Sequence, residues 1–289
     1  LLLSRAIRQG LDSCADILPD CLPDGVRQAH QLCRMNYAYE NIHFPEAPEA
    51  LDIARRRLAF EELFFFAIGL KLLRSRRETV SVEPFQPVDM APFYNALPFT
   101  LTDAQRRCVE EAIADMQSGK PMNRLCQGDV GSGKTMVAAA CVYFCIKNGH
   151  QAALMAPTEL LAEQHYRGLA PLLERLNIRC ALLTGSTPAK TKRSVTAQLA
   201  TGEIDFAIGT HALISGGVAY ADLGLVVTDE QHRFGVAQRT ALAEKGEHPH
   251  TLVMSATPIP RTLALILYGD LDVSVIDQLP PGRKPIETY

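Results

Sequence analysis

A glycine-rich stretch from Gly128 to Thr135 has the residue types and the spacing of a phosphate-binding loop. Its sequence, GDVGSGKT, fits the pattern G-x-x-x-x-G-K-[ST]. Glycines let the backbone turn tightly and direct several N–H groups to one point, where the positive end of a following helix dipole adds to the attraction. Lys134 can reach the β- and γ-phosphates of a nucleotide, and the Thr135 hydroxyl can bind Mg²⁺. The loop residues predicted to contact the nucleotide are Gly128, Gly131, Ser132, Gly133, Lys134 and Thr135.

The neighbouring sequence favours this interpretation over the alternative of an ordinary glycine-rich turn. Residues 123–127 can form a short strand before the loop, and residues 136–146, MVAAACVYFCI, predict an almost wholly apolar helix after it. A helix that is apolar on all sides is typical of one buried against a sheet. Strand, loop and helix therefore come in the order that a P-loop needs.

Two adjacent acids follow another apolar strand. The predicted strand 223–228 ends at Asp229 and Glu230. In a doubly wound fold, ligands bind beyond the carboxyl ends of the strands. Asp229 is placed to hold Mg²⁺ through water, and Glu230 to orient and deprotonate the water that attacks the γ-phosphate. Adjacent acids also occur by chance, but a pair at a strand end after a P-loop favours a catalytic role, shared with Lys134. His232, taken alone, is more typical of a structural histidine.

A nucleobase site is predicted before the P-loop strand. Thr102 can cap a helix that runs to about residue 117. Phe99 precedes this helix and Gln105 lies in its first turn. An adenine site can use an aromatic side chain together with a glutamine amide, which offers both a donor and an acceptor to the base edge. An ordinary capped amphipathic helix explains the same residues equally well, and both interpretations stay open.

The elements that position these residues alternate along the chain. After the P-loop, short apolar runs are separated by helical stretches. This alternation predicts an α/β fold with a mostly parallel sheet and helices on both faces. The strands predicted beyond the P-loop cover residues 151–156, 178–184, 205–209, 223–228 and 251–255.

The first third of the chain is predicted to be helical. Prolines separate short helical stretches, and residues 49–77 then predict one long helix. Its heptad-spaced apolar face is expected to dock on a core through Leu51, Leu58, Phe65 and Leu72. Two arginine clusters, 55–57 and 74–77, could contact phosphates, although such runs more often form a solvated face. Prolines at 84, 87, 92 and 98 forbid regular structure over residues 83–98, which predicts a linker.

Composition limits the classes of function. The chain has 289 residues, 47% of them hydrophobic, and a net charge of −3, so charge alone does not indicate a polyanion partner. The eight cysteines contain no C-x-x-C pair, which favours buried reduced thiols over disulfides or zinc. No signal peptide is visible, and the apolar run 63–73 is interrupted by Lys71 and too short to span a bilayer. We therefore expect a cytoplasmic protein.

The order of these motifs over residues 97–285 resembles that of the superfamily 2 helicases of the DExH group. The matching segments are 128–135 (motif I), 156–165 (motif Ia), 184–186 (motif Ib), 209–211 (motif Ic), 229–232 or DEQH (motif II) and 255–257 or SAT (motif III). The resemblance implies a RecA-like P-loop lobe that binds ATP and Mg²⁺.

The resemblance also implies roles for residues outside the P-loop. Backbone and hydroxyl donors at four strand ends would hold DNA phosphates, and these are Thr158, Gly185, Ser186 and Thr210. Ser255, Thr257 and Arg261 would couple the γ-phosphate to the DNA side, and His232 would contact the nucleotide. A helix cap before Pro258 explains Ser255 and Thr257 about equally well.

Longer strings narrow the resemblance to the RecG family of bacterial branched-DNA helicases. They are residues 127–135, DEQHRFGV at 229–236, PIPRT at 258–262, LPPGR at 279–283 and ARRRLAFEELF at 54–64. The family implies an ATP-driven motor that remodels stalled forks and Holliday junctions in recombination and repair. The transcription-repair coupling translocases are a competing family, and the DEQH and ARRRLAFEELF strings argue against them. A nucleotide-binding module without motor activity is the rival from another class.

The resemblance predicts how the chain divides. Residues 1–82 would be the helical end of a wedge domain with its linker helix, 83–98 a proline-rich linker, 99–278 the first motor lobe, and 279–289 the start of a connection to a second lobe. The chain begins with Leu1, so the first domain is expected to be incomplete. The arginine finger and motifs IV to VI would belong to the second lobe. Residues 1–289 alone are therefore expected to hydrolyse ATP at close to the background rate.

Overall fold

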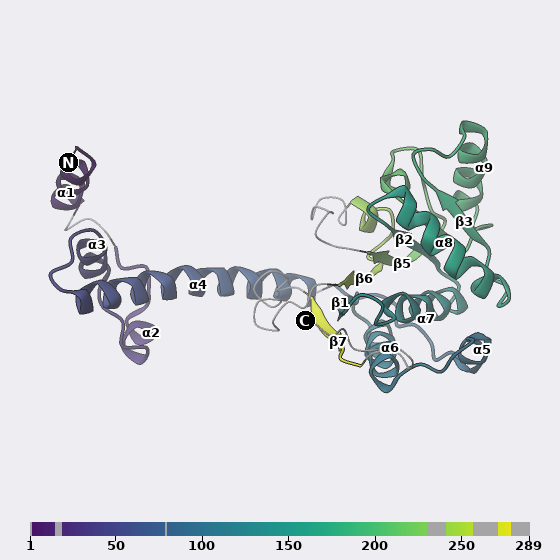
Figure 1. Cartoon of the computed structure of the whole chain (residues 1–289), viewed down its shortest axis with the longest axis horizontal. Helices are drawn as coiled ribbons and strands as arrows, with labels where there is room; N and C mark the ends of the chain where they lie inside the picture. The colour runs from purple at the N-terminus through teal and green to yellow at the C-terminus, as the bar shows by residue number, and fades with distance from the viewer. Residues whose placement is uncertain (1, 15–18, 79, 230–240, 257–270, 279–289) are drawn as a thin grey trace, which may run out of the picture. The chain divides into compact units, whose positions relative to one another are not determined.

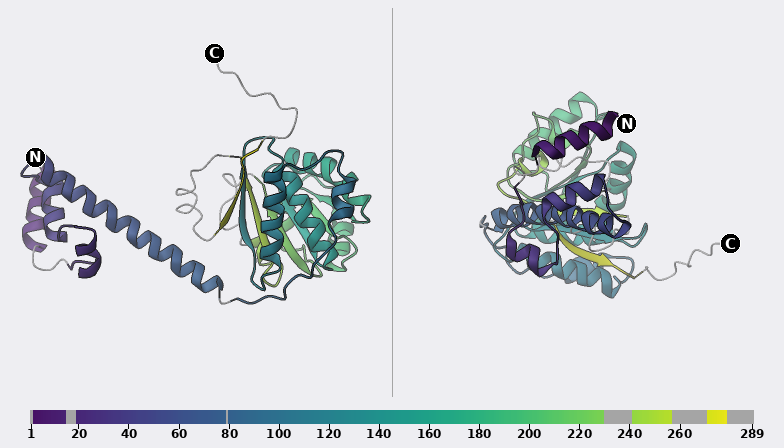
Figure 2. Two further views of the ribbon diagram at one scale, coloured as in Figure 1. Left: turned by 90° about the horizontal axis from the view of Figure 1, so that it is seen from below. Right: turned by 90° about the vertical axis from the view of Figure 1, so that its left-hand side faces the viewer.

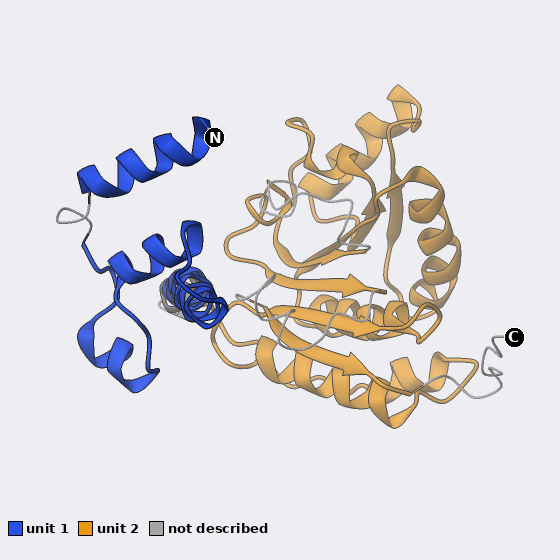
Figure 3. Ribbon diagram, turned by 60° about the vertical axis from the view of Figure 1, so that its left-hand side comes forward, with its two compact units in different colours: residues 1–73 blue, residues 74–289 orange. Residues whose placement is uncertain are grey.

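The computed structural model describes residues 2–14, 19–78, 80–229, 241–256 and 271–278. The chain separates into two compact units, residues 1–73 and 74–289, which Figure 3 colours separately. Among the described residues, no helix combines the length and the apolar composition that crossing a bilayer requires. The domain limits inferred from the family resemblance stay a prediction.

The first unit is built from helices (Figure 1). The long helix α4 (Pro48–Glu78) confirms the prediction for residues 49–77. It begins at a proline, which fits the first turn because the N–H that proline lacks would have no partner within the helix there. The preceding helices are α1 (Leu2–Cys14), α2 (Asp24–Ala29) and α3 (Met35–His43).

The predicted apolar face of α4 is covered over only part of its length. Leu51 and Leu58 are half-buried, whereas Phe65 and Leu72 are 46% and 60% exposed. The prediction that this whole face docks on a core is therefore wrong for Phe65 and Leu72. Heptad spacing identifies side chains that share a face, but it does not say what covers them.

The arginine cluster 55–57 is not uniformly solvated. Arg57 is fully buried, and its guanidinium donates to Glu61 at 2.5 Å, to Asp20 at 2.6 Å and to the carbonyl oxygen of Cys33 at 3.1 Å. A buried guanidinium requires such partners because an unpaired buried charge is costly. Both sequence interpretations are wrong for Arg57, which instead ties α4 to the segments that precede α2 and α3.

The stretch 83–98 is not free of regular structure. It contains a short helix, α5 (Ala91–Ala96), with Pro92 in its first turn. Before this helix, the Phe85 N–H donates to the carbonyl oxygen of Met116, and the Phe85 ring stacks on His150 with centroids 4.7 Å apart. The prediction that the prolines forbid regular structure is therefore wrong. Proline disrupts the interior of a helix, but it is compatible with the first turn.

The second unit is built on a sheet whose strands Figure 2 draws as arrows beside helices. Seven strands are described, and all of their pairs are parallel. The strands are β1 (Asn123–Gly128), β2 (Gln151–Met155), β3 (Cys180–Leu183), β4 (Phe206–Gly209), β5 (Leu223–Thr228), β6 (His250–Ser255) and β7 (Asp272–Ile276). Their order in the sheet is β3-β4-β2-β5-β6-β1-β7. The predicted α/β class with a mostly parallel sheet is confirmed.

Strand β7 was not predicted from the sequence. Its residues, DVSVI, mix polar and apolar types and are only partly buried, and among the described strands it lies at the edge of the sheet beside β1. Inner strands of a parallel sheet are buried on both faces and form continuous apolar runs. An edge strand that is only partly buried lacks that signal.

Helices cover both faces of the sheet. The helices α6 (Asp103–Met116), α7 (Lys134–Lys147) and α8 (Glu159–Glu174) pack in one hydrophobic cluster with strand residues such as Leu154 and Val227. The helix α9 (Ala189–Ala200) and the 3₁₀ helix η1 (His211–Ile214) pack in a second cluster with Ala153 and Val226. Since successive strand residues point to opposite faces, the two clusters lie on opposite sides of the sheet.

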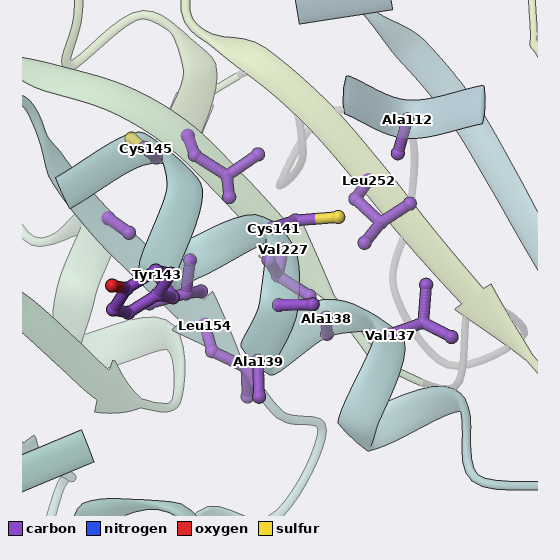
Figure 4. Close-up of a cluster of buried hydrophobic side chains, with 14 of the residues drawn as sticks. Ala112, Val137, Ala138, Ala139, Cys141, Tyr143, Cys145, Leu154, Val227 and Leu252 are labelled. Carbon is purple, nitrogen blue, oxygen red and sulfur yellow. The ribbon is translucent and has the colours of Figure 1, made fainter. Parts of the chain in front are cut away.

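Helix α7 is buried on nearly all sides in the first cluster. Figure 4 shows its side chains, among them Cys141, near Leu154, Val227 and Leu252 of three strands. Burial raises the pKa of Cys141 to about 12, so this thiol is protonated and unreactive at neutral pH. The eight cysteines are free thiols, and four of them are buried. In the described part of the chain, no group of three or more His, Cys, Asp and Glu side chains is placed to hold a metal ion.

Candidate functional site

The loop after β1 has a backbone that only glycine adopts easily. Gly131 and Gly133 have φ values of +77° and +89°, in the left-handed region. A Cβ atom on residue 133 would lie 2.2 Å from Nε2 of Gln105. Gly133 is also the N-cap of the 14-residue helix α7, so the loop leads into the positive end of a helix dipole. The predicted strand, loop and helix are confirmed.

The Lys134 ammonium group bonds to the backbone of the loop. Its Nζ donates to the carbonyl oxygens of Gly128 and Asp129 at 2.8 and 2.9 Å. The Ser132 hydroxyl is buried and has no hydrogen-bond partner among the described residues. A buried hydroxyl without a partner needs an explanation, and an anion held by the loop N–H groups would supply one.

Gln105 fastens α6 to this loop. Its Nε2 donates to the carbonyl oxygen of Ser132 at 2.8 Å, and its Oε1 accepts from the N–H of Thr102 at 2.9 Å. Thr102 accepts from the Gln105 N–H in return, which completes a capping box and confirms Thr102 as the N-cap. Both polar ends of the Gln105 amide are thus used within the protein, as the interpretation of an ordinary capped helix expects. Its contact with an adenine edge stays a prediction.

Phe99 lines a cavity of about 400 Å³ beside α6. Its ring is 50% exposed, and the cavity wall also includes Arg106 and Tyr94. The Arg106 guanidinium carbon lies 5.5 Å from the centroid of the Tyr94 ring. Aromatic faces beside a guanidinium can receive a flat ring system. The nucleobase site stays a prediction. The sequence analysis named Phe99 for it, and the structure adds Arg106 and Tyr94 beside Phe99.

The sheet order places the predicted site residues along one edge, because the carboxyl ends of parallel strands lie together. Taken in the order β3, β4, β2, β5, β6 and β1, the strands lead at their carboxyl ends to Ser186, Thr210, Thr158, Asp229, Ser255, which is the last residue of β6, and the P-loop. The predicted DNA contacts therefore follow three adjacent strands, and the predicted nucleotide and coupling residues follow the next three. The two groups meet between β2 and β5.

Asp229 lies at this meeting point and bonds to the neighbouring elements. Its backbone N–H donates to the carbonyl oxygen of Met155, the last residue of β2, at 3.0 Å. Its Oδ2 lies 2.5 Å from Nε2 of His165 in α8, and the two side chains are only 13% and 11% exposed. An ionised carboxylate can only accept a hydrogen bond, so we assign the hydrogen to Nε2 of His165.

The predicted DNA contacts are held in different ways. The Thr158 hydroxyl caps α8 by accepting from the N–H of Leu161 at 3.3 Å. The Ser186 N–H donates to Oε1 of Glu159 at 3.0 Å, so a carboxylate already occupies this donor. The Thr210 hydroxyl is buried and lacks a hydrogen-bond partner in the described part of the chain. The three segments therefore differ in how readily they could receive a phosphate.

Some predicted site residues lie outside the described residues, and these are Glu230, His232, Thr257 and Arg261. Of the predicted coupling residues, Ser255 is described. It ends β6 and is buried. Its strand lies between the strands that precede Asp229 and the P-loop, a position that suits a coupling role. That role stays a prediction.

A sequence model of the DEAD/DEAH box helicases matches residues 102–266, more than half of the chain. The chain belongs to this family. The matched range includes the P-loop, the proposed DNA contacts and Asp229, so the DEAD/DEAH box resemblance covers the whole carboxyl edge described above.

Within the DEAD/DEAH box helicases, the chain is similar to RecG proteins over nearly its full length. It is 49% identical to the ATP-dependent DNA helicase RecG of Bacillus subtilis, across 100% of this chain and 43% of that protein. It is 46% identical to RecG of Thermotoga maritima, across 99% of this chain and 37% of that protein. The predicted resemblance to the RecG family is confirmed. The chain spans less than half of the length of these relatives.

Solved structures agree with this assignment. A structure of RecG bound to a three-way DNA junction superposes with a TM-score of 0.83 at 44% identity, covering 98% of this chain and 38% of that one. The DEAD-box helicase Mss116 bound to single-stranded RNA has a TM-score of 0.51 at 16% identity, covering 66% of this chain and 43% of that one. The second likeness shows a shared fold only.

The DEAD/DEAH box site offers the atoms that Mg²⁺ and a triphosphate require. Thr135 lies in the first turn of α7, and Asp229 supplies a carboxylate. Mg²⁺ prefers such oxygen ligands. The ammonium group of Lys134 and the buried hydroxyl of Ser132 suit phosphate oxygens. The described residues therefore fit both groups.

Sequence reasoning gave no role to two residues of this helicase-family site, His165 and Glu159. Both lie inside the segment that resembles motif Ia. The sequence did contain a signal for His165, because the apolar residues Ala162 and Leu169 lie about one helical turn before and after it. In the structure both are fully buried. A histidine on such an apolar helix face needs a polar partner. No local pattern identified that partner as Asp229.

Proposed function

We propose that this chain carries the nucleotide-binding motor lobe of an ATP-dependent helicase that acts on branched DNA. The arrangement along the carboxyl edge of the sheet supports the proposal, because the P-loop and an acidic residue lie beside a row of hydroxyl and backbone N–H groups that could bind phosphates. RecG relatives are named ATP-dependent DNA helicases, and a RecG structure contains a three-way DNA junction. Forks and Holliday junctions are therefore the proposed substrates. A bacterial cytoplasmic location belongs to the same proposal.

In this function, the P-loop binds and orients the triphosphate of ATP. The loop N–H groups and Lys134 hold the β- and γ-phosphates, for which Lys134 exchanges the carbonyl oxygens of Gly128 and Asp129 for phosphate oxygens. Thr135 and, through water, Asp229 would hold Mg²⁺, and the bound metal would offset negative charge on the phosphates. Glu230, the residue after Asp229, accepts the proton of the attacking water.

The base would enter the cavity lined by Phe99 and Arg106. Phe99 supplies a half-exposed aromatic ring, and Arg106 supplies a planar cation that can stack on a base. Gln105 supports the P-loop from the adjoining helix and is also the proposed adenine contact. His232 is proposed to contact the nucleotide on the strength of the family resemblance.

The DNA backbone would lie against the ends of β3, β4 and β2. Thr158, Ser186 and Thr210 carry hydroxyl groups there. The backbone N–H groups of Gly185 and Ser186 donate to Glu159 and would exchange that carboxylate for a phosphate. Such donors fix a nucleic-acid backbone without reading its sequence, which suits a motor that moves along DNA of any sequence. Ser255, Thr257 and Arg261 are proposed to relay the state of the γ-phosphate to this surface.

Equilibrium binding tests the nucleotide part of the proposal. A fluorescent ATP analogue with Mg²⁺ should bind the chain. Lys134→Ala should lower its affinity by about a hundredfold, because a charge-assisted contact to the phosphates is lost. Unchanged affinity in Lys134→Ala would refute the proposed nucleotide site.

A labelled three-way junction tests the DNA part. The double variant Thr158→Ala, Thr210→Ala should bind the junction about tenfold more weakly and bind the ATP analogue as before. Thr201→Ala is a matched control, because Thr201 is an exposed residue at the C-terminal end of α9. Nucleotide binding without any junction binding would favour a nucleotide-binding module that has no DNA track. An equal loss of affinity for the junction and for the ATP analogue would contradict a DNA surface that is separate from the nucleotide site.

A further inference from the structure

Helix α8 connects the proposed DNA surface to the proposed metal site. It starts after its N-cap, Thr158, at the end of β2. His165 follows Thr158 by seven residues, about two helical turns and about 10 Å along the axis, so both residues lie on similar faces of one rigid element. The fully buried Ala162 and Leu169 mark this face as the one that packs into the lobe. His165 therefore points inward, where it contacts Asp229.

The contact constrains the orientation of the Asp229 carboxylate. One oxygen, Oδ2, is bonded to His165 at 2.5 Å, and the Asp229 backbone is fixed separately by its bond to Met155. A residue that binds a metal through water must present its oxygen in a defined direction. Partners behind metal-binding residues commonly provide that direction.

We propose that His165 is a positioning residue that orients Asp229 for Mg²⁺ and couples this orientation to α8, whose N-terminal end carries a proposed DNA contact. The inference rests on the proposed function and adds a residue to which that function gave no role. Histidines on an apolar helix face commonly serve only to satisfy a buried polar group. His165 differs from that case because its partner is the acidic residue after β5, at the junction of the two halves of the site.

Coupling follows from the rigidity of α8. A DNA phosphate that contacts Thr158 biases the position of the helix, and a metal that binds at Asp229 biases the carboxylate that His165 holds. Both ligands therefore act on the single contact between His165 and Asp229. Linkage requires the effect to be reciprocal, so DNA must change the affinity for Mg²⁺-nucleotide by the same factor as Mg²⁺-nucleotide changes the affinity for DNA.

The first test separates metal-dependent binding from nucleotide binding in general. The affinity of the chain for a fluorescent ADP is measured with Mg²⁺ and with EDTA, and the ratio is the metal-dependent gain. In His165→Ala this gain should fall about tenfold, the usual cost of losing a partner behind a metal ligand, while the affinity in EDTA stays the same. His165→Gln should restore much of the gain, because its side-chain amide can also donate to Asp229.

Controls make the outcome specific. Arg167→Ala changes the same helix at a side chain that is 78% exposed and should leave the gain unchanged. Where His165→Ala fails to fold, His165→Met takes its place, because methionine fills the volume without donating to a carboxylate. Equal losses with Mg²⁺ and with EDTA would overturn the inference, and so would an unchanged gain. Absence of nucleotide binding in the parent chain would instead refute the proposed function.

The second test measures the coupling itself. The Kd for a three-way junction is determined with and without a non-hydrolysable ATP analogue and Mg²⁺. The parent chain and His165→Gln should show a several-fold change in Kd, whereas His165→Ala should show none. No coupling in the parent chain, or coupling that persists in His165→Ala, would overturn the link between α8 and the metal site.

Discussion

The side-chain amide of Gln105 donates to the carbonyl oxygen of Ser132 over 2.8 Å, and this bond holds the P-loop against α6. A base-reading role for Gln105 and a loop-supporting role make different predictions. If the bond supports the loop, Gln105→Ala should lower the affinity for ATP and GTP analogues equally, by about three- to tenfold for one lost hydrogen bond. Competition titrations against a fluorescent nucleotide measure both affinities.

A selective loss of ATP affinity would instead favour adenine recognition by Gln105. Gln117→Ala serves as the control, since Gln117 is the C-cap at the other end of the same helix. That substitution should leave both nucleotide affinities unchanged.

Glu159 places a negative charge on a proposed DNA contact. Hydrogen bonds from the Ser186 side chain, and then from the backbone N–H groups of Ser186 and Gly185, lower the pKa of Glu159, so it is ionised at neutral pH. A DNA phosphate must displace or oppose this carboxylate. Glu159→Gln should therefore raise the affinity for duplex DNA by roughly two- to fivefold at low salt, and by less as salt screens the charge.

Fluorescence anisotropy over a range of salt concentrations checks the effect of Glu159. Glu163→Gln is its control, because Glu163 lies on the same helix and pairs with Arg167. Weaker DNA binding by Glu159→Gln would mean that the carboxylate chiefly shapes the loop around Ser186.

The buried Arg57 should dominate the local stability of the first unit. Arg57→Met removes the donors to Asp20, Glu61 and the carbonyl oxygen of Cys33. Breaking such a network should lower the free energy of local opening by about 2–4 kcal/mol. Hydrogen exchange of the amides in α2 and α3 measures this change.

Arg55→Met gives the comparison for Arg57. The Arg55 side chain is 65% exposed, and its nitrogen lies 3.9 Å from Asp52. Its loss should alter local opening by no more than about 0.5 kcal/mol. Similar exchange rates in the two variants would contradict the role given to Arg57.

Because of His250, the free energy of unfolding should decrease as the pH falls below about 6.5. Burial, and then the nearby His150, lower the pKa of His250 to about 4, and its Nδ1 accepts a hydrogen bond from the N–H of Met122. Its unfolded pKa is about 6.5, so between these values the unfolded chain binds more protons. The contribution is fully present above about pH 6.5 and is lost as the pH falls towards 4, for a total of about 3 kcal/mol.

His250→Asn keeps an acceptor for Met122 and removes the titration. Urea unfolding from about pH 7 to about pH 4.5 should give a shallower loss of stability for this variant than for the parent chain. Parallel pH profiles would show that other groups carry the dependence.

Local patterns sufficed for the part of the molecule in which neighbouring residues decide the structure. The P-loop could be predicted because Gly131 and Gly133 adopt positive φ values, which favour glycine. Helix α7 could be predicted because its sequence is apolar on all sides. The inner strands were readable because both of their faces are buried. In each case, the residues that form the element also produce the local sequence pattern from which it was predicted.

The features that were missed depend on partners that are distant in sequence. Arg57 was expected among solvated or phosphate-contacting charges, but it is neutralised by Asp20, 37 residues earlier. The partner of His165 is Asp229, which lies 64 residues later and comes close only because the fold brings α8 beside the end of β5. Periodicity describes one element at a time and therefore cannot supply such pairs.

The edge position of β7 extends the influence of a nucleotide beyond the residues that would touch it. Among the described strands, β7 pairs only with β1, the strand that leads into the P-loop. Edge elements open more readily than central ones, and opening of β7 would expose one flank of β1. A ligand that binds only the closed form suppresses such openings by a factor of 1 + [ligand]/Kd. The amides of β7 would then report occupancy of the P-loop through slower exchange with solvent deuterium, although none of the predicted nucleotide contacts lies in this strand.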